Sequence, residues 1–585
     1  MHTSLFIVQP APGDFTFFYL YIMKDIVYVA KTFKLLREHQ PWKLALIFAV
    51  TLFMGVNSGF SIMLLIPLLQ LLNVGAGSTV QGPGHVIMNL AEKAGINLSI
   101  ETILVTYVIL LTLNAFLQYW KTMLDTRYRQ TLIYYLRKRL FRKIINAEWQ
   151  VLNSRSKTGH LQILTREVPN LAEYVYYYLK LITTVIISAS YIAYAMVVSV
   201  RFTLLIIAVG GILFFILRRY LSRSFRLGED FAMSYNRLLK YIDDFWQTVK
   251  IAKVHNSEDF YYEKFDEAST SLLDLESTIQ KNWSLPQFIY RISGIILLVV
   301  IVYAGYKTGR VPVTSFFILI ILFSRIFPQF VGMNTDLNMI LSHVASVRLV
   351  LGLDEDLKNN VADERVAGGS VSAVKEIRLE KICFAYSDGE QLFENFSEII
   401  PAGCITGIIG VSGIGKTTLI DIIAGLQRPD SGEIFIDDRR LDEESFPGWK
   451  RAIGYLPQDP FFIDGTLREN LIWDSGRETD DNEIMNVLEM VNAAHLPGRF
   501  KNGLDEFIVN YQFSFSGGEC QRLALARVML RKPSLLFLDE ATSSLDAENE
   551  AQIMDVIIKL KKEMTIIFVT HRVSLLEYFD KVIRL

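Results

Sequence analysis

Cysteine is almost missing from this chain, and its scarcity excludes a disulfide-stabilised secreted protein. Only Cys383, Cys404 and Cys520 occur in 585 residues, all in the C-terminal part, which fits a reducing cytosol. The first 22 residues also lack the basic region, apolar core and small-residue cleavage site of a signal peptide. Neither sign of charge is in excess, and the net charge of −2 at pH 7 argues neither for nor against nucleic-acid binding.

Apolar residues, by contrast, are abundant. They make up 51% of the chain, and the mean hydropathy of +0.29 is too high for an ordinary soluble enzyme. A membrane-spanning helix needs about 20 such residues in a row. We predict six spans, at residues 44–72, 102–120, 171–198, 202–217, 287–306 and 312–334. Only Ser199, Val200 and Arg201 separate the third from the fourth, so a five-span arrangement stays open.

Lysine and arginine are distributed unevenly between the connections, which predicts the orientation of the spans. The connections after the second and fourth spans are rich in both residues. The connections after the odd-numbered spans carry only Lys93, Arg201, Lys307 and Arg310. Both termini are therefore predicted to be cytoplasmic. The protein itself is predicted to lie in the cell (inner) membrane. Apolar residues at helical spacing in 134–145 and 238–246 predict that the membrane helices extend into the cytoplasm, and solvated loops are the alternative.

The composition changes after residue 353, where a stretch rich in acidic residues, Gly and Ser predicts a linker. We therefore expect an all-α six-helix transmembrane domain followed by an α/β domain. The predicted boundaries are an N-terminal extension with an interfacial helix at 1–40, a transmembrane domain at 41–353, the linker at 354–373, and the α/β domain at 374–585.

A glycine-rich stretch, Gly-Val-Ser-Gly-Ile-Gly-Lys-Thr-Thr at 410–418, fits the phosphate-loop pattern of P-loop NTPases. It follows the apolar run 405–409 and precedes a predicted helix at 417–424, so its backbone N–H groups can bind an anion. Lys416 would contact the outer phosphates, and the Thr417 hydroxyl would bind Mg²⁺. An ordinary glycine-rich turn is the alternative. The predicted nucleotide contacts here are Gly410, Ser412, Gly413, Gly415, Lys416, Thr417 and Thr418.

An apolar run at 535–538 ends in two acids, Asp539 and Glu540. A carboxylate at the end of such a strand can reach Mg²⁺, and we predict that Asp539 does so. Neighbouring side chains on a strand point to opposite faces, which would turn Glu540 toward a water molecule near the γ-phosphate. A strand that merely meets a solvated turn is the alternative, but the phosphate loop in the same domain disfavours it.

The stretch Phe-Ser-Gly-Gly-Glu-Cys-Gln-Arg at 515–522 lies between these two motifs and resembles the signature motif of ATP-binding cassette proteins. The resemblance implies that Ser516, Gly517, Gly518 and Glu519 bind the γ-phosphate of ATP held by a second chain. It further implies that Tyr386 stacks on adenine, that Gln458 forms the Q-loop, and that residues 544–546 form the D-loop. His571 matches the switch histidine, although a lone histidine is more often structural. The implied catalytic residues are Glu540, His571 and Gln458, and the implied metal ligands are Thr417, Gln458 and Asp539.

Six spans followed by one cassette resemble a half-size exporter of this superfamily, which works as a dimer. A homodimer is the simplest assembly, with membrane lipid and the transported substrate as further partners and no nucleic acid. The resemblance places coupling helices near 159–170 and 236–247. Three departures stand out: Glu519 replaces the usual glutamine and adds a negative charge near phosphate, residues 509–512 contain no acid, and no last strand or helix of the cassette is expected after His571.

The substrate is suggested by two arginines within the predicted spans, Arg291 and Arg325. If both face a cavity, an anionic headgroup or carboxylate is favoured, and otherwise they snorkel or pair within the bundle. Residues 59–72 and the sixth span resemble the lipid-linked oligosaccharide flippase branch. The predicted function is ATP-driven export or flipping of an amphipathic molecule. A peptide or drug exporter is the alternative, and an importer or a regulatory cassette protein has less support.

Overall fold

The computed structural model describes residues 31–32, 34–64, 99–153, 156–308, 313–359, 375–386, 391–442, 445–473, 479–542 and 547–585. The chain divides into two compact units. The membrane unit comprises Met1–Ile145 and Ser154–Asn360, and the cassette unit comprises Asn146–Asn153 and Val361–Leu585. The predicted D-loop at 544–546 lies outside the described residues, as do the first part of the predicted interfacial helix and the end of the first predicted span.

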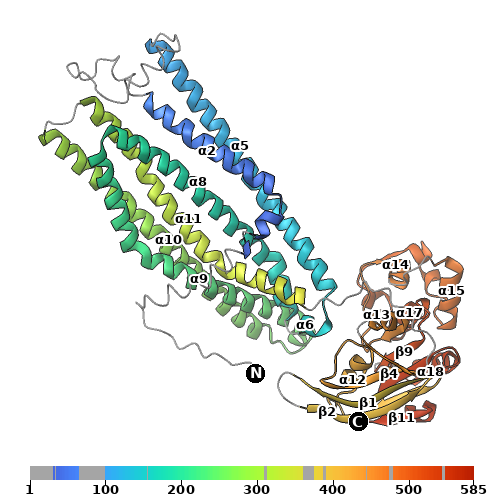
Figure 1. Cartoon of the computed structure of the whole chain (residues 1–585). Coiled ribbons are helices and arrows are strands. Elements are labelled where there is room, and N and C mark those ends of the chain that lie inside the picture. Colours follow the sequence, from blue (N-terminus) through green and yellow to red (C-terminus); the bar gives the residue numbers. More distant parts are fainter. Residues whose placement is uncertain are drawn as a thin grey trace. The chain divides into compact units, whose positions relative to one another are not determined.

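Six helices of the membrane unit are long and apolar enough to cross a membrane, as predicted (Figure 1). They are α2 (Pro41–Met63), α5 (Ile100–Ile145), α8 (Val168–Val198), α9 (Val200–Val254), α10 (Glu258–Thr308) and α11 (Val313–Asn359). The five-span alternative is wrong, because Ser199 has extended backbone angles (φ −162°, ψ 107°) and separates α8 from α9.

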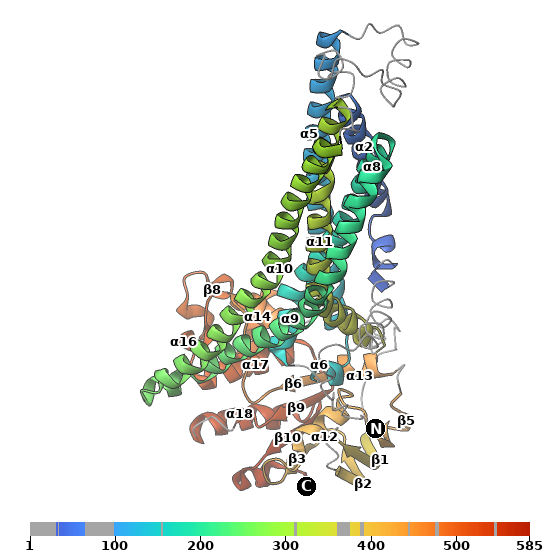
Figure 2. The ribbon, with the colours of Figure 1, turned by 90° about the vertical axis from the view of Figure 1, so that its left-hand side faces the viewer.

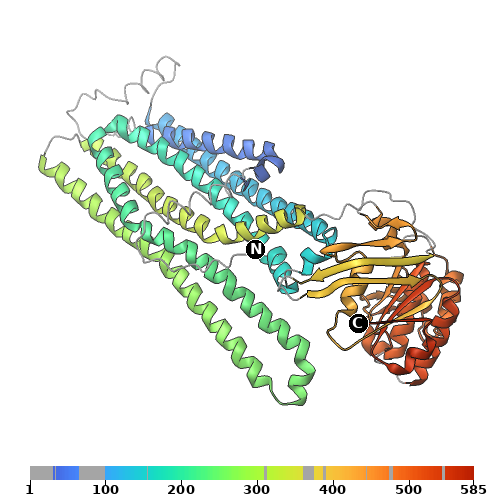
Figure 3. The same cartoon turned by 60° about the horizontal axis from the view of Figure 1, so that its bottom comes forward.

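Two of these helices extend well past their apolar segments, which confirms that the basic connections are helical. Helix α5 continues to Ile145, and α9 continues to Val254 and packs along α10 to the turn that joins them (Figures 2 and 3). Residues 236–247, a predicted coupling helix, lie inside α9 rather than in a separate short helix. Residues 159–170 span α7 (Lys157–Gln162), a π-helical turn (Ile163–Glu167) and the start of α8, all in the membrane unit.

Helix α11 lies at the centre of the membrane unit, where it packs against α8, α9 and α10. A buried polar cluster joins three of these helices: Asn338 on α11 accepts a hydrogen bond from Ser224 Oγ on α9 (2.7 Å), and Asn282 on α10 donates to the same Ser224 oxygen (2.8 Å). Buried polar side chains need such partners, because leaving them unpaired costs free energy. The cluster therefore fixes the register of the three helices.

A second polar contact in this unit is an ion pair between helices. Lys180 Nζ on α8 lies 2.8 Å from Asp336 Oδ1 on α11, and Thr184 Oγ1 donates to the other carboxylate oxygen (3.2 Å). The Asp336 side chain is fully buried, whereas that of Lys180 is 41% exposed. The pair lies within two helices long enough to span a membrane.

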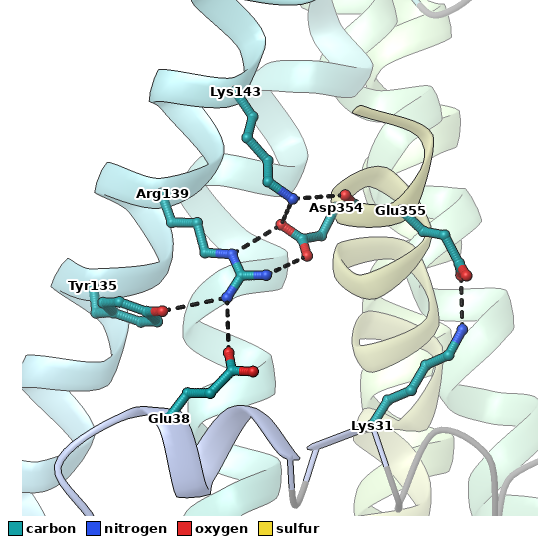
Figure 4. Close-up of polar contacts among 7 residues, drawn as sticks. All are labelled: Lys31, Glu38, Tyr135, Arg139, Lys143, Asp354 and Glu355. Atoms are coloured by element: carbon teal, nitrogen blue, oxygen red, sulfur yellow. Dashed lines mark hydrogen bonds and ion pairs between the residues drawn. The ribbon is translucent and has the colours of Figure 1, made fainter. Parts of the chain in front are cut away.

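The last turns of α11 are held by charged contacts. Figure 4 shows Arg139 and Lys143 of α5 converging on Asp354, with nitrogen-to-oxygen distances of 2.8 and 2.6 Å. Arg139 also lies 3.4 Å from Glu38, and the neighbouring Glu355 pairs with Lys31 at 2.7 Å. The N-terminal segment, α5 and the end of α11 are thus joined at one place.

The cassette unit contains a parallel five-stranded sheet in the order β11-β3-β10-β9-β6 and an antiparallel four-stranded sheet in the order β2-β1-β4-β5 (Figure 2). The parallel strands are β3 (Ile405–Ile409), β6 (Ile453–Leu456), β9 (Leu535–Asp539), β10 (Thr565–Thr570) and β11 (Lys581–Arg584). The antiparallel strands are β1 (Glu376–Ala385), β2 (Gln391–Pro401), β4 (Ser431–Ile436) and β5 (Arg439–Arg440), and a short pair is β7 (Gly465–Thr466) with β8 (Phe507–Ile508). The fully buried runs of β9 and β10 explain their continuous apolar sequence.

Helices and turns complete the cassette unit. The helices are α12 (Lys416–Ile423), α13 (Phe446–Ala452), α14 (Leu467–Ile472), α15 (Asp481–Met490), α16 (Tyr511–Ser514), α17 (Gly517–Leu530) and α18 (Ala547–Leu560). Short 3₁₀ turns lie at Pro497–Arg499, Gly503–Asp505 and Val573–Tyr578. The expectation of no strand after His571 is wrong, because β11 pairs in parallel with β3 and buries Ile583.

A short piece of chain from the first half of the sequence completes the cassette unit. Residues 146–153, which include helix α6 (Trp149–Asn153), belong to the cassette unit. In this segment Gln150 donates to the Gln427 side chain (2.9 Å), and Glu148 pairs with Arg428 (2.7 Å). The segment of the α5–α8 connection that packs with the cassette is therefore 146–153, which lies before the predicted coupling range 159–170.

Candidate nucleotide-binding site

The phosphate loop connects β3 to α12, as predicted, and its shape depends on glycine. Gly413 and Gly415 have φ angles of +84° and +104°, which side-chain-bearing residues rarely adopt. A Cβ atom on Gly415 would also lie 2.7 Å from Leu392 Cδ2. The loop ends at the N-terminus of α12, where free N–H groups attract anions.

Lys416 is buried in this loop, where no ion pair with an acidic side chain forms among the described residues, although the charge of Asp539 is near enough to interact with it. Only 7% of it is exposed, and Nζ donates to the backbone oxygens of Gly410 and Val411, both at 3.1 Å. Neutral carbonyl oxygens compensate a buried ammonium less well than an anion does. The loop therefore holds a positive charge that a phosphate oxygen can take over.

The predicted metal ligands Thr417 and Asp539 come together, since Thr417 Oγ1 lies 3.4 Å from Asp539 Oδ2. A hydroxyl and a carboxylate are the hard oxygen donors that Mg²⁺ prefers, and nucleotide phosphates commonly supply the rest. Among the described residues no group of three or more His, Cys, Asp and Glu side chains could hold a metal ion. These two side chains fit Mg²⁺ delivered together with a nucleotide.

Glu540 and His571 also lie close together, with His571 Nδ1 3.6 Å from Glu540 Oε1. The separation of Asp539 from Glu540 has a different origin from the one predicted. Strand β9 ends at Asp539, and Glu540 adopts a left-handed φ of +49° while its N–H donates to the Val569 carbonyl (3.0 Å). Glu540 thus lies outside the regular strand, so the alternation rule does not extend to it, and left-handed residues of this kind are common at functional sites.

Tyr386 and Gln458 follow β1 and β6 in the same unit. The Tyr386 ring is 47% exposed and packs edge-on against Phe384 (5.1 Å between centroids), while its hydroxyl lies 2.8 Å from Thr418 Oγ1. Tyr386 is thus next to the phosphate loop, and its stacking on adenine stays a prediction. Gln458 follows β6, the strand beside β9 at whose end Asp539 lies.

The signature stretch forms the start of α17, with Ser516 as its N-cap. The Ser516 hydroxyl accepts from the Glu519 N–H, and Glu519 Oε2 accepts from the Ser516 N–H (2.8 Å), which makes a reciprocal capping box. The other Glu519 oxygen lies 2.5 Å from Arg499 Nη2. The expected extra negative charge is therefore paired and turned back onto the helix cap. Gly517 and Gly518 supply the first N–H groups of the helix.

Two cassette residues near the metal ligands escaped prediction. One is Tyr455, whose hydroxyl donates to Asp539 Oδ2 (3.0 Å). The other is Asp421, whose pKa is raised to about 6, mainly by burial and also by the negative charge of Asp539. Burial also raises the pKa of Asp539, whereas the Tyr455 hydrogen bond opposes that rise. Tyr455 precedes the predicted Gln458 by three residues, and an aromatic hydroxyl at the end of that strand was the available signal.

We expect Tyr455→Phe to raise the Mg²⁺ concentration needed for half-maximal ATP hydrolysis by about tenfold, because second-shell partners of metal ligands typically contribute that much. The measurement is the initial rate at fixed ATP while Mg²⁺ is titrated. Tyr578→Phe, which removes a tyrosine hydroxyl from the 3₁₀ turn Val573–Tyr578 in the same unit, is the control. A lower melting temperature with an unchanged Mg²⁺ requirement would show that Tyr455 only supports folding.

The predicted substrate residues Arg291 and Arg325 lie on α10 and α11, and both are exposed on the single chain. Neither forms an ion pair among the described residues. The membrane unit instead pairs Lys180 with Asp336, and Lys121 with Asp125 one turn along α5 (2.6 Å). Lys180 stood inside a predicted span, so a charged residue at that depth was a visible signal that the prediction did not use.

Comparison with known proteins shows similarity to ABC transporters in both parts of the chain. Residues 393–543 match the ABC transporter family model, and residues 43–329 match the model of the ABC transporter transmembrane region, which together cover well over half of the chain. A bacterial Atm1-family ABC exporter solved with ATP bound superposes with a TM-score of 0.75 at 17% identity, covering 94% of each chain. That likeness concerns the fold.

The similar proteins of known sequence are also ABC transporters. The chain is 36% identical over 209 residues to an uncharacterised ABC transporter ATP-binding protein, y4gM, of Sinorhizobium fredii, covering 36% of this chain and 35% of the relative. It is 26% identical over 385 residues to the ATP-dependent lipid A-core flippase of Xylella fastidiosa, covering 65% of each. A multidrug resistance ABC transporter of Lactococcus lactis is 34% identical over 208 residues, covering 36% of this chain and 35% of that protein. The matches thus span between 35% and 65% of these relatives.

Both family models, the apolar membrane helices and the cassette geometry lead to one assignment: the chain belongs to the ABC transporter family and carries a transmembrane region followed by a nucleotide-binding domain.

Proposed function

We propose that this exporter hydrolyses ATP to move an amphipathic molecule, lipid-linked or anionic, out of or across the cytoplasmic membrane. The observation that carries the proposal is the convergence in one cassette of a phosphate loop with a buried lysine, a hydroxyl–carboxylate pair for Mg²⁺, and the Glu540–His571 pair. A regulatory cassette protein would not need all three.

The chemistry follows from the positions of these side chains. Glu540 orients or deprotonates the water that attacks the γ-phosphate, and His571 donates to the same phosphate group. Lys416 exchanges its two carbonyl contacts for phosphate oxygens and stabilises their charge. Mg²⁺, held through Thr417 and Asp539 with Gln458 nearby, supplies Lewis-acid stabilisation of the same charge when it is bound.

The working unit we propose is a homodimer, with the cassettes and both termini in the cytoplasm. One chain carries one phosphate loop and one signature helix, and in the family that the chain resembles the two motifs at each nucleotide come from different chains. Closure of the two cassettes on ATP favours an outward-facing state, and hydrolysis resets the transporter. Helix α6, which belongs to the cassette unit by its contacts, would carry the motion toward the membrane helices.

The substrate class is suggested by charge in the membrane helices and by the names of relatives. Arg291 and Arg325 are exposed on the single chain, and ionisable residues within spans are costly unless they serve a function. One relative is an ATP-dependent lipid A-core flippase, and its name favours a lipid-linked substrate. The second candidate, a peptide or drug exporter, is favoured by the multidrug resistance relative.

The experiment is ATP hydrolysis by the full chain in nanodiscs, with lipid-linked glycans, peptides and amphipathic drugs added in turn. We expect glycolipids to stimulate the rate, and we expect Arg291→Ala and Arg325→Ala to reduce that stimulation while the basal rate persists. Stimulation by peptides alone would contradict the substrate preference. Transport in the inward direction in sealed vesicles would contradict export.

A further inference from the structure

Glu519 stands at the third position of the signature helix α17, and both of its carboxylate oxygens are engaged. Oε2 accepts from the Ser516 N–H (2.8 Å), and Oε1 lies 2.5 Å from Arg499 Nη2 and 4.0 Å from His495 Nε2. The Glu519 side chain is only 10% exposed, against 46% for Arg499 and 54% for His495. Although burial opposes it, these hydrogen bonds hold the pKa of Glu519 below its usual range, so the carboxylate is ionised at neutral pH.

Arg499 reaches Glu519 from a separate element that is fixed in place. It ends the 3₁₀ turn Pro497–Arg499, and Leu496 and Pro497 beside it are buried in the cassette core. The next residue, Phe500, packs edge-on against Phe515 with 5.7 Å between ring centroids. Because Phe515 directly precedes the N-cap Ser516, this turn and the start of α17 are held together on two sides of the ion pair.

An unpaired carboxylate at this place would oppose the function that the helix start is suited to. The N-terminus of a helix attracts anions through its free N–H groups, and a side-chain anion there competes with phosphate for the same positive potential. A planar guanidinium bound to the carboxylate cancels that charge and also fixes the direction of the side chain. The arginine thus keeps the first amides of α17 available to an incoming anion.

We propose that Arg499 is a positioning residue for ATP, which neutralises Glu519 and holds its carboxylate on the helix cap, so that the start of α17 can accept the γ-phosphate of the nucleotide bound to the partner chain. The inference deepens the proposed function and rests on it, since it needs two cassettes that close over ATP. Arg499 itself does not touch the nucleotide. Its effect is expected on the apparent affinity for ATP.

The test is a double-mutant cycle on the full chain in nanodiscs, with ATP hydrolysis measured over a range of ATP concentrations. In the wild-type background, R499A is expected to raise the ATP concentration for half-maximal rate about tenfold, with the maximal rate changed less than twofold. In the E519Q background the same R499A substitution is expected to change that concentration less than twofold. R499K, which keeps the charge, should recover most of the affinity.

Lys501→Ala, which removes an exposed cation two residues further on, is the matched control and should leave the ATP dependence unchanged. An equal R499A effect in both backgrounds, or a fall in maximal rate with loss of melting temperature, would show a role in folding and overturn the inference. No effect of R499A in either background would also overturn it. If the wild-type chain hydrolyses no ATP, the proposed function fails, and binding of a fluorescent ATP analogue to the same variants still decides the role of Arg499.

Discussion

Replacement of Glu540 by glutamine is expected to lower the rate of ATP hydrolysis by about 10²–10⁴-fold, the usual contribution of a general base. The amide is nearly the same size, so the left-handed backbone at this residue (φ +49°) and its N–H bond to Val569 should persist. ATP binding by the phosphate loop should therefore survive. Single-turnover hydrolysis and equilibrium ATP binding, measured on the same preparation in nanodiscs, separate the two effects.

Glu548→Gln is the matched control for this substitution, because Glu548 is an exposed acid in the first turn of α18. Its hydrolysis rate should equal that of the wild type. The variant His571→Ala is expected to lose less activity than Glu540→Gln, because His571 would donate to the phosphate and does not take the proton from water. Retention of more than a tenth of the wild-type rate by Glu540→Gln would contradict the assignment of Glu540 as the base.

The second large effect is expected in the membrane unit, on replacement of Lys180 by methionine. Asp336 is fully buried and faces Lys180 at 2.8 Å, so the substitution leaves a buried carboxylate with only the Thr184 hydroxyl. Breaking an ion pair from one side typically costs about 3–5 kcal/mol when both groups are buried, and the 41% exposure of the Lys180 side chain lowers that cost here. We expect a clear fall in the melting temperature of the detergent-solubilised protein, followed by light scattering.

The control is Lys253→Met, which removes the lysine of an exposed pair with Glu258 (3.0 Å), where 65% of the lysine side chain is in solvent. Exposed pairs contribute little, so its melting temperature should stay close to that of the wild type. Adding Asp336→Leu to Lys180→Met should restore much of the lost stability, because no buried charge then remains unpaired. If the double variant is no more stable than Lys180→Met alone, the contact between these two residues is not what stabilises α8 against α11.

Much of the architecture could be predicted because it depends on local patterns. Apolar runs of sufficient length reveal spans, and the continuous apolar stretches of β3, β9 and β10 mark buried parallel strands. The phosphate loop could be placed because its glycines act within nine residues of sequence. Strand β11 was missed because it has only four residues and depends on pairing with β3, far away in the chain.

The features that escaped prediction depend on contacts between distant parts of the sequence. Asp336 lies just beyond the predicted sixth span, and nothing near it in sequence indicates Lys180, which is more than 150 residues earlier. The effect of Glu519 on phosphate binding was predicted from its charge alone. Arg499, which pairs with it, lies twenty residues earlier in sequence and comes close only through the folded turn Pro497–Arg499. The rule that neighbouring side chains of a strand point to opposite faces does not apply to Asp539 and Glu540. Strand β9 ends at Asp539, and Glu540 has a left-handed backbone conformation.

Helix α6 has a consequence for how the cassette can be produced and studied. Residues 146–153 are synthesised more than 200 residues before the rest of the cassette unit, yet they supply the side chains that pair with Gln427 and Arg428. A cassette fragment beginning at residue 374 would lack Gln150 and Glu148, which contact those two side chains. Isolated cassettes of this protein are therefore expected to fold more stably when a peptide covering 146–153 is supplied, and the cassette in the whole chain can reach its final form only once the membrane half presents that segment.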